Sequence, residues 1–372
     1  MGKRVLITGG AGFIGSHLAD ELLRHGYRVR ALDNLSPQVH GEGRRRPSYL
    51  SADVELQVGD VRDDAAVTKA LEGADVVVHF AAAVGVGQSM YQVAEYTSVN
   101  NLGTAVLLEA IAKRPVERLL VASSMSVYGE GLYRAPGGGV RVGVERGEAQ
   151  LRASDWEVRD EEGRPLEPLP TPETKTPSLA SVYALSKYDQ ERLCLMLGRA
   201  YKVPTVALRF FNVYGPRQAL SNPYTGVLAI FAARLLNDSP PLVFEDGEQR
   251  RDFVSVYDVA RACRLALEND AATGRVLNVG SGRSVTVSEV ARRAAHAVGK
   301  PKIEPVVTGK CRVGDIRHCF ADVSLAREVL GYEPKVEFSA GLEELAGWLA
   351  GQRADDRAEQ ARAELEARGL TL

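Results

Sequence analysis

The feature that most constrains the fold is the regular alternation, in the first half of the chain, of short apolar runs with segments of helical periodicity. A strand that is apolar on both faces must be covered on both faces, and a helix between two such strands supplies the crossover of a parallel pair. The pattern therefore predicts an α/β fold with a doubly wound parallel sheet. The expected strands are Lys3–Thr8, Arg28–Asp33, Glu55–Asp60, Asp75–Phe80, Arg118–Ser123 and Pro204–Phe210. The expected helices are Phe13–His25, Ala65–Leu71, Val99–Lys113 and Ser181–Tyr201.

A smaller lobe is expected after Pro216, where loops, proline-containing connections and isolated helices replace the alternation. The isolated helices are expected at Gly226–Asn237 and Thr286–Val298. The chain is expected to return to the sheet near Arg251–Glu268 and Val276–Gly280, so that the two lobes are interleaved.

Two segments stand apart from this pattern. Residues 131–170 are rich in Gly, Pro and charge and lack a helical period, which is typical of a long insertion. Such a loop can be functional or mobile, or it can form a small packed hairpin around Trp156 and the valines Val140, Val142, Val144 and Val158. The charged, Ala-rich tail from Gln352 to Arg368 predicts a solvated terminal helix.

Composition excludes several classes of partner. The 46 Lys and Arg residues nearly balance the 48 Asp and Glu residues, so no chain-wide attraction to nucleic acid or anionic lipid is expected. The longest apolar stretches are too short for a bilayer span, and the chain begins in a strand pattern, so a cytoplasmic protein is expected. The cysteines (Cys194, Cys263, Cys311 and Cys319) show no CxxC pairing, and His17 and His79 lack metal-ligand spacing. No disulfide framework and no metal site are expected.

A glycine-rich turn, Thr8 to Gly15, lies between the first expected strand and the first expected helix. Its glycines let backbone amides approach a pyrophosphate at the positive end of the helix. Asp33 ends the second strand near the spacing expected for the acid that binds an adenosine ribose, and its charge favours NAD over NADP. The basic run Arg44 to Arg46 can be a solvated loop or a phosphate clamp, and charge runs are usually solvated.

Tyr183 and Lys187 stand four residues apart on an expected helix and so share one face. A cation near a tyrosine stabilises the phenolate, which can then remove a hydroxyl proton. Ser124 follows the fifth strand and so emerges at the carboxyl edge of the sheet, where α/β sites form. Together with the glycine turn, these residues predict a hydride-transfer site.

On these motifs, from about Lys3 to Trp348, the chain resembles extended short-chain dehydrogenases/reductases of the NAD-dependent nucleotide-sugar epimerase and dehydratase family. The resemblance implies a Rossmann-type NAD-binding domain at 1–216, with the 131–170 insertion and returns near 251–280. It implies a nucleotide-sugar lobe mainly at 217–350, followed by the charged helical tail at 351–372. It also implies a homodimer built from the Val99–Lys113 and Ser181–Tyr201 helices.

The same resemblance assigns roles residue by residue. Catalysis would fall to Ser124, Tyr183 and Lys187. NAD would contact Gly9, Gly12, Phe13, Ile14, Gly15, Asp33, Asn34, Asp60, Val61, Phe80, Ala81, Ala82, Tyr183 and Lys187. The nucleotide-diphosphate sugar would contact Ser124, Asn212, Arg251, Arg312 and Cys319. Guanidinium groups pair well with phosphates, which is a physical reason for arginine at two of these positions.

The two residues after Ser124 bear on the reaction class. Sugar 4,6-dehydratases of the family carry adjacent Asp and Glu there, because elimination of water needs an additional acid and base. This chain has Met125 and Ser126, which favours a 4-epimerase that oxidises C4 and returns the hydride to the opposite face. The stretch also resembles family members that act on dTDP-linked 6-deoxyhexoses such as dTDP-L-rhamnose.

Other functions and one pocket residue stay open at this stage. A UDP-hexose or UDP-hexuronate 4-epimerase, a nucleotide-sugar dehydratase, decarboxylase or reductase, and an NAD-sensing regulator on the same fold are the alternatives. Val84 stands where some family members have a polar residue near the nicotinamide. Cys319 stands where some UDP-hexose 4-epimerases have a tyrosine beside the C2 substituent, so it is either a gate for that substituent or ordinary packing.

Overall fold

The centre of the molecule is a sheet of seven parallel strands in the order β14-β9-β5-β4-β1-β2-β3. The computed structural model describes residues 2–142, 145–312 and 314–371. The strands are β1 (Arg4–Thr8), β2 (Arg28–Asp33), β3 (Glu55–Val58), β4 (Val76–His79), β5 (Arg118–Ser124), β9 (Thr205–Phe210) and β14 (Val276–Val279). Every residue of β4 and β5 is buried, because helices cover both faces of these central strands. The predicted doubly wound parallel sheet is confirmed.

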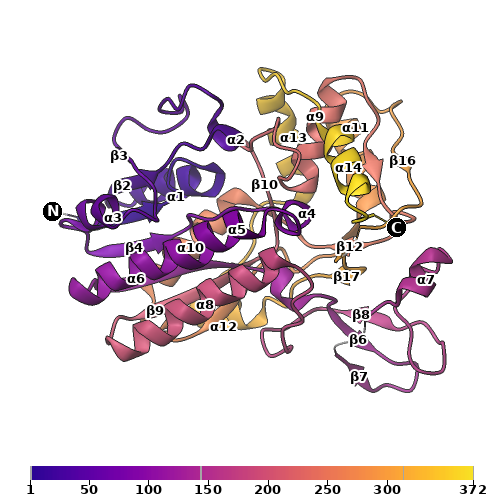
Figure 1. Cartoon of the computed structure of the whole chain (residues 1–372), viewed down its shortest axis with the longest axis horizontal. Coiled ribbons are helices and arrows are strands. Elements are labelled where there is room, and N and C mark those ends of the chain that lie inside the picture. The colour runs from indigo at the N-terminus through magenta and orange to yellow at the C-terminus, as the bar shows by residue number, and fades with distance from the viewer. Residues whose placement is uncertain (1, 143–144, 313, 372) are drawn as a thin grey trace.

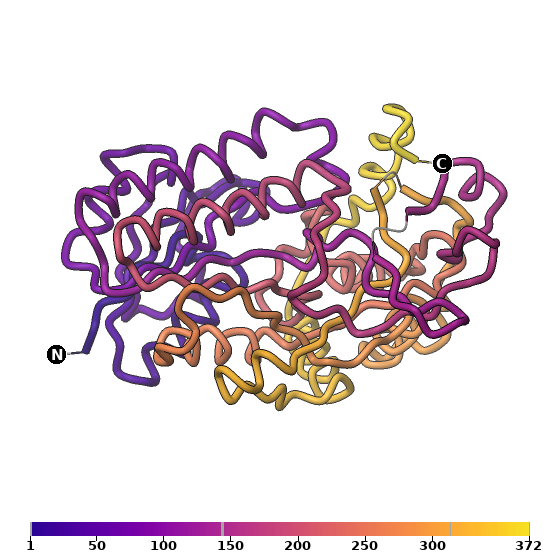
Figure 2. Tube along the Cα trace, turned by 90° about the horizontal axis from the view of Figure 1, so that it is seen from below, coloured from indigo at the N-terminus to yellow at the C-terminus, as the bar shows by residue number. Residues whose placement is uncertain are grey.

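Helices form a layer on each face of this sheet (Figures 1 and 2). One face is covered by α1 (Phe13–Arg24), α10 (Val256–Glu268) and α12 (Ser324–Leu330), and the other by α3 (Asp64–Leu71), α6 (Gly103–Lys113) and α8 (Val182–Ala200). Leu18 and Val259 belong to the first of the two cores, and Leu107 and Cys194 to the second. The helix expected from Val99 in fact starts earlier, with α5 (Val93–Tyr96) and a π-helical turn at Thr97–Leu102 that leads into α6. The other short helices are α2 (Pro37–His40), α4 (Val86–Ser89) and the 3-10 turns Met125–Tyr128 and Asp270–Ala272.

The smaller lobe packs three helices, α9 (Val227–Leu236), α11 (Val287–Ala297) and α13 (Phe338–Leu349), around a third apolar core. Among the described residues outside the insertion, the other strands are short and form two pairs and one three-stranded sheet. They are β10 (Asn212–Tyr214) with β13 (Phe253–Ser255), β11 (Leu242–Val243) with β16 (Val306–Val307), and β12 (Arg250–Arg251) between β15 (Val285–Thr286) and β17 (His318–Cys319). Within the described residues, no helix is long and apolar enough to cross a membrane.

The insertion at residues 131–170 folds as a small unit of its own beside the smaller lobe (Figure 1). Strands β7 (Val140–Arg141), β6 (Leu132–Arg134) and β8 (Glu167–Leu169) form an antiparallel sheet, accompanied by α7 (Glu148–Arg152). Tyr133, Val158 and Leu166 lie in its core, whereas Val140 and Val142 are exposed and Trp156 is half-buried. The segment is therefore a small packed unit, as one of the two alternatives predicted. Of the valines named for it, Val158 lies in its core, whereas Val140 and Val142 do not. Val144 lies outside the described residues.

A terminal helix forms as expected, but it is only partly solvated. Helix α14 (Ala358–Ala367) buries Ala361 and Leu365, which are four residues apart and so share one face. A Cβ placed on Gly87 would lie 3.3 Å from Leu365 Cδ1, so this glycine leaves room for the leucine. On the same helix, Glu364 Oε2 accepts hydrogen bonds from the hydroxyls of Tyr91 at 2.9 Å and Tyr224 at 2.8 Å. The tail therefore contacts both lobes.

Candidate active site

The glycine turn connects β1 to α1 and leaves no room for side chains. Gly9 has φ +70°, and a Cβ there would lie 2.9 Å from the backbone nitrogen of Ala81. A Cβ on Gly15 would lie 2.4 Å from the carbonyl oxygen of Gly9. The turn residues named from the sequence are Gly9, Gly12, Phe13, Ile14 and Gly15, with Gly12 as the N-cap of α1. A bare backbone at the positive end of a buried helix fits the pyrophosphate of a dinucleotide.

Asp33 is buried at the carboxyl end of β2, beside that turn. Its Oδ2 accepts the backbone N–H of Ala11 at 3.0 Å, and its Oδ1 accepts the backbone N–H of Leu35 at 2.9 Å. These two bonds fix the orientation of the carboxylate. Each oxygen keeps a further lone pair with which it can accept a ribose hydroxyl.

The residues expected near the adenine form a small polar cluster at the end of β3. Asn34 Nδ2 donates to Asp60 Oδ2 at 3.1 Å, and Val61 is buried. Arg62 donates to both carboxylate oxygens of Asp60, at 2.8 and 2.9 Å, and lowers the pKa of Asp60 to about 2. Sequence reasoning did not anticipate this ion pair. The loop between α2 and β3 exposes Arg44, Arg45 and Arg46, as expected for a solvated loop.

The carboxyl end of β4 lies against the glycine turn. The expected cofactor-lining residues Phe80, Ala81 and Ala82 are all half-buried there. The ring of Phe80 packs edge-on against Phe210 at 5.8 Å between centroids, and the N–H of Ala81 donates to Thr8 Oγ1 at 3.2 Å. Val84, further along, is 44% exposed.

Both histidines named from the sequence have structural partners. His79 lies between the hydroxyls of Thr8 and Thr104, each 2.8 Å from a ring nitrogen, and burial lowers its pKa to about 3. His17 Nε2 lies 3.1 Å from the carbonyl oxygen of Pro216, and burial lowers its pKa to about 4. Neither ring is held as a metal ligand, and the described residues contain no acidic, Cys or His cluster that could bind a metal.

Tyr183 stands in the first turn of α8, next to Ser124 at the end of β5. The helix begins at Ser181, whose Oγ accepts the N–H of Ala184 at 3.1 Å, and the N–H of Tyr183 donates to Ser89 Oγ at 3.0 Å. These two bonds fix the start of the helix and thus the position of the phenol. Burial raises the pKa of Tyr183, and the hydrogen bond with Ser124 acts against that rise.

Lys187 lies one turn further along α8, as expected. Its Nζ donates to Gln190 Oε1 at 2.6 Å, and burial lowers the pKa of Lys187 to about 8. The stabilisation of the Tyr183 phenolate by this ammonium stays a prediction. On the other side, Ser126 Oγ donates to Ser124 Oγ at 2.8 Å, so the serine hydroxyl already has a fixed partner.

Two of the expected substrate ligands lie on neighbouring short strands beyond the sheet edge. Asn212 opens β10, and its Oδ1 is buried without a hydrogen-bond partner among the described residues. An amide oxygen in that position is costly unless a ligand supplies a donor. Arg251, on β12, donates from Nη1 to the carbonyl of Arg317 at 2.8 Å and from Nη2 to that of Ile316 at 2.5 Å. Its guanidinium is thus held in one orientation.

The other two expected ligands flank these strands. Cys319 pairs with Arg251 across the β12–β17 ladder and is only 1% exposed, with Sγ 3.8 Å from Thr171 Oγ1. Arg312 lies outside the ladder, where Nε donates to Asp315 Oδ2 at 2.8 Å and the guanidinium covers the ring of Phe244 at 4.6 Å. The structure thus brings Arg251 and Cys319 into register and gives Arg312 its own acidic partner.

Sequence reasoning missed the residues that hold these ligands in place. Ser126 could have been found, because it lies two residues from Ser124 and both carry hydroxyls. No local motif marks Ser89, Glu130 or the insertion residues Arg146 and Glu157, since their partners lie far away in the chain. No spacing rule addresses such contacts.

Comparison with known proteins identifies the family. The profile of the NAD dependent epimerase/dehydratase family matches residues 5–143 and 158–280, and the gap between these ranges falls inside the insertion. A dTDP-L-rhamnose 4-epimerase from Burkholderia thailandensis is 38% identical over 354 residues, which are 94% of this chain and 95% of that protein.

Solved structures agree with this match. A UDP-glucose 4-epimerase from Thermus thermophilus in complex with NAD has a TM-score of 0.74 and 33% identity, over 94% of this chain and 99% of that one. A UDP-N-acetylglucosamine 4-epimerase from Methanobrevibacter ruminantium has a TM-score of 0.76 and 29% identity, over 94% and 99% of the two chains. The expected fold, NAD cofactor and isomerase class are confirmed by these relatives, and the chain belongs to the NAD-dependent epimerase/dehydratase family.

Proposed function

We propose that the protein is a nucleotide-sugar 4-epimerase whose substrate is a dTDP-linked 6-deoxyhexose. The observation that carries the reaction class is the placement of three side chains: Tyr183 in the first turn of α8 lies beside Ser124 at the end of β5, and Lys187 follows one helical turn later. This pair of hydroxyls is placed where a sugar hydroxyl can accept one hydrogen bond and give up one proton. The presence of all three residues argues against a purely NAD-sensing regulator.

In this mechanism the side chains transfer the proton of the sugar O4 hydroxyl and hold the O4 oxygen in place. The Tyr183 phenolate removes the proton from the sugar O4, and the Ser124 hydroxyl donates to O4 while negative charge develops there. When bound, NAD supplies a reversible hydride acceptor for C4. Tyr183 then returns the proton after the ketone has turned its other face, so the net reaction is inversion at C4.

Ionisation of Tyr183 is the demanding step, because burial raises its pKa. Because Ser124 Oγ accepts from Ser126, its one proton is left to donate: to the phenolate before the sugar binds, and to O4 once the sugar is bound. Lys187 contributes the positive charge of α8 nearest to the phenol on the same helix face, and with NAD bound it would hold the nicotinamide ribose. Gly9, Gly15 and Asp33 would hold the pyrophosphate and the adenosine ribose.

Met125, the residue after Ser124, supports both the proposed reaction class and the proposed class of sugar. Met125 replaces the acid of a 4,6-dehydratase, and it belongs to an apolar cluster with Phe211 and Cys319. Such surroundings favour a C6 methyl group over a hydroxymethyl or carboxylate, which would need polar partners when buried. The 38% identical relative is described as a dTDP-L-rhamnose 4-epimerase, which points to the same sugar class.

The substrate is tested with a panel of UDP-, dTDP-, GDP- and CDP-sugars, with products identified by mass spectrometry and NMR. We expect dTDP-L-rhamnose to be converted to its C4 epimer without net production of NADH. In deuterated water the product should carry no deuterium on carbon, because the original hydride is returned. Deuterium at C5 would show that a carbon-bound proton exchanges, as in a dehydratase or a 3,5-epimerase, and stoichiometric NADH would show a net oxidation.

The proposal includes the division of the chain and its assembly. Residues 1–216 would hold NAD, and residues 217–350 would mainly hold the nucleotide sugar.

A homodimer through α6 and α8 is supported by exposed apolar side chains on and next to these helices, including Leu102 at 53%, Leu185 at 46% and Met196 at 52%. Sedimentation of the wild type and of Met196→Glu tests this assembly: the variant should dissociate, and an unchanged dimer would place the interface elsewhere. A cytoplasmic location stays a prediction.

A further inference from the structure

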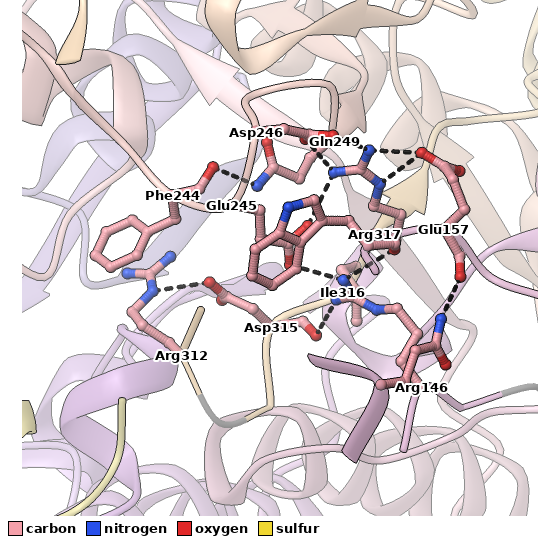
Figure 3. A network of polar contacts seen from close by, with 12 residues as sticks. Arg146, Glu157, Phe244, Glu245, Asp246, Gln249, Arg312, Asp315, Ile316 and Arg317 are labelled. Carbon is pink, nitrogen blue, oxygen red and sulfur yellow. Dashed lines mark hydrogen bonds and ion pairs between the residues drawn. The ribbon is translucent and has the colours of Figure 1, made fainter. Parts of the chain in front are cut away.

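The insertion and the smaller lobe meet at a fully buried arginine, Arg317 (Figure 3). Its Nη2 donates to Glu157 Oε1 at 2.6 Å, and its Nη1 donates to Glu245 Oε2 at 2.9 Å and Asp246 Oδ1 at 2.6 Å. Glu157 comes from the insertion, whereas the other two acids come from the loop after β11. One guanidinium thus joins two parts of the chain that are distant in sequence.

Two more insertion-side residues reach the same segment. Arg146 donates from Nη1 to Glu245 Oε1 at 2.8 Å and from Nη2 to the carbonyl oxygen of Asp315 at 3.2 Å. Glu130, the residue just before the insertion, accepts the backbone N–H of Arg317 at 2.6 Å and that of His318 at 3.1 Å. Residues 315–318 are therefore held through both their backbone and the Arg317 side chain.

This segment is the support of both expected diphosphate ligands. The carbonyl oxygens of Ile316 and Arg317 orient the guanidinium of Arg251. Asp315 orients that of Arg312 (Figure 3). A shift of the segment would move these two guanidinium groups together. Bidentate contact with a phosphate depends on such orientation, because the guanidinium is planar and rigid.

A gain in folding stability does not by itself explain why these charged side chains are buried. Removing charged groups from water is costly, and an apolar packing of the same volume is often as stable. The network buries Arg146, Glu245 and Arg317 almost completely, with side-chain exposures of 3%, 1% and 0%. A rigid scaffold of defined geometry is what such an arrangement supplies in addition to stability.

We propose that the 131–170 insertion is a positioning element, in which Glu157, acting through Arg317, sets the orientation of Arg251 toward the diphosphate of the nucleotide sugar. This inference rests on the proposed function, since it takes Arg251 as a diphosphate ligand. Glu157 is a positioning residue and does not itself touch the substrate. The insertion thereby contributes to nucleotide affinity and not to the chemistry at C4.

The test measures the binding of dTDP to the purified holoenzyme by calorimetry in a double-mutant cycle of Glu157→Gln and Arg251→Lys. Glu157→Gln should weaken dTDP binding roughly tenfold, the size expected for losing one hydrogen bond to a charged partner. It should raise KM for the sugar nucleotide and leave kcat within about twofold, because the C4 chemistry is untouched. In the Arg251→Lys background the same change should have little further effect.

The matched control is Glu148→Gln, on the same insertion, whose carboxylate pairs only with the exposed Arg152 among the contacts of the described residues. It should bind dTDP like the wild type. Unchanged or tighter binding by Glu157→Gln, or an equal loss in both Arg251 backgrounds, would overturn the positioning role. If Arg251→Lys itself binds dTDP normally, the diphosphate role of Arg251 fails first, and the inference falls with it.

Retained NAD and an unchanged melting temperature of each variant exclude general unfolding. If Glu157→Gln does unfold, Glu157→Asp takes its place in the cycle.

Discussion

The two ends of the active site are built in different ways. At the dinucleotide end, the key groups are backbone atoms of one short turn, and the space they need exists because Gly9 and Gly15 have no side chains. At the substrate end, the key groups are side chains, and Arg251 is held by segments 65 and 66 residues away in the sequence. The first end is a local structure, and the second is a product of tertiary packing.

This difference predicts how each end responds to change. A turn made of backbone fails by steric overlap, because a single added methyl group has no space to occupy. A network of charged side chains fails by losing orientation, so its damage appears in ligand affinity before it appears in stability. Tyr183 stands between the two ends, where its start-of-helix position depends on Ser89 and its phenol on Ser124.

The largest effect is expected where the two ends meet. Tyr183→Phe removes the hydroxyl that takes the O4 proton and should lower kcat by at least ~100-fold, the lower range for losing a general base. Because the ring remains, the packing against Tyr96 at 6.4 Å and the bound NAD should be preserved. Steady-state kinetics with NAD content as the control check this prediction, and near-normal turnover would remove Tyr183 from the mechanism.

The next effect concerns the dinucleotide end alone. Gly15→Ala places a Cβ 2.4 Å from the Gly9 carbonyl oxygen and 2.7 Å from Gly10 Cα. Since both neighbours are backbone atoms, the turn itself must shift, and we expect a loss of ~1–3 kcal/mol in the free energy of unfolding together with loss of NAD. Denaturant titration and the NAD content of the purified protein are the measurements.

A second glycine gives the opposite sign and serves as the control. Gly347 lies inside α13, and nothing stands within 4 Å of a Cβ placed there. Gly347→Ala should therefore raise stability by about 0.5–1 kcal/mol, because alanine loses less backbone entropy in a helix. If both variants behaved alike, the clash at Gly15 would not be the cause of its effect.

The same contrast explains what could be predicted from the sequence. The strands, the glycine turn, Asp33 and the Tyr183–Lys187 pair follow from periodicity and short spacings, which a sequence displays directly. The docking of α14 could not be predicted from the sequence. Its buried face consists of only Ala361 and Leu365, within a segment that is otherwise rich in charge. The acceptor of the Lys187 ammonium, Gln190, is close in sequence, yet its choice depends on the burial of α8 against β5.

The insertion shows the limit most clearly. In the sequence, Arg317 is one of several charged residues in a polar segment. Its neighbours in the chain do not predict that it lies at the centre of a buried network. Its partners Glu157 and Glu245 lie 160 and 72 residues away. Pairings over such distances are set by how the lobes pack, and short sequence patterns do not encode them.

The narrowest effect expected, a change in the choice between two substrates, concerns Cys319 at the substrate end. Its thiol is 1% exposed and packs with Met125 and Phe211 in one apolar cluster, which also suits ordinary packing. If the cluster borders the C2 substituent, Cys319→Tyr should depress activity on an N-acetylated hexose more than on its 2-hydroxy counterpart, by ~1–3 kcal/mol. The comparison uses kcat/KM, on one enzyme preparation, for a 2-acetamido sugar and its 2-hydroxy counterpart on the same nucleotide, chosen from the sugars that the substrate panel shows to be converted. Because both constants scale with the amount of folded protein, their ratio is insensitive to destabilisation by the bulky ring. Cys319→Ala, which removes volume, should leave the ratio unchanged or favour the larger sugar. Equal losses on both substrates with Cys319→Tyr would show that the cysteine is packing and that the gate, if this pocket has one, is made by other side chains.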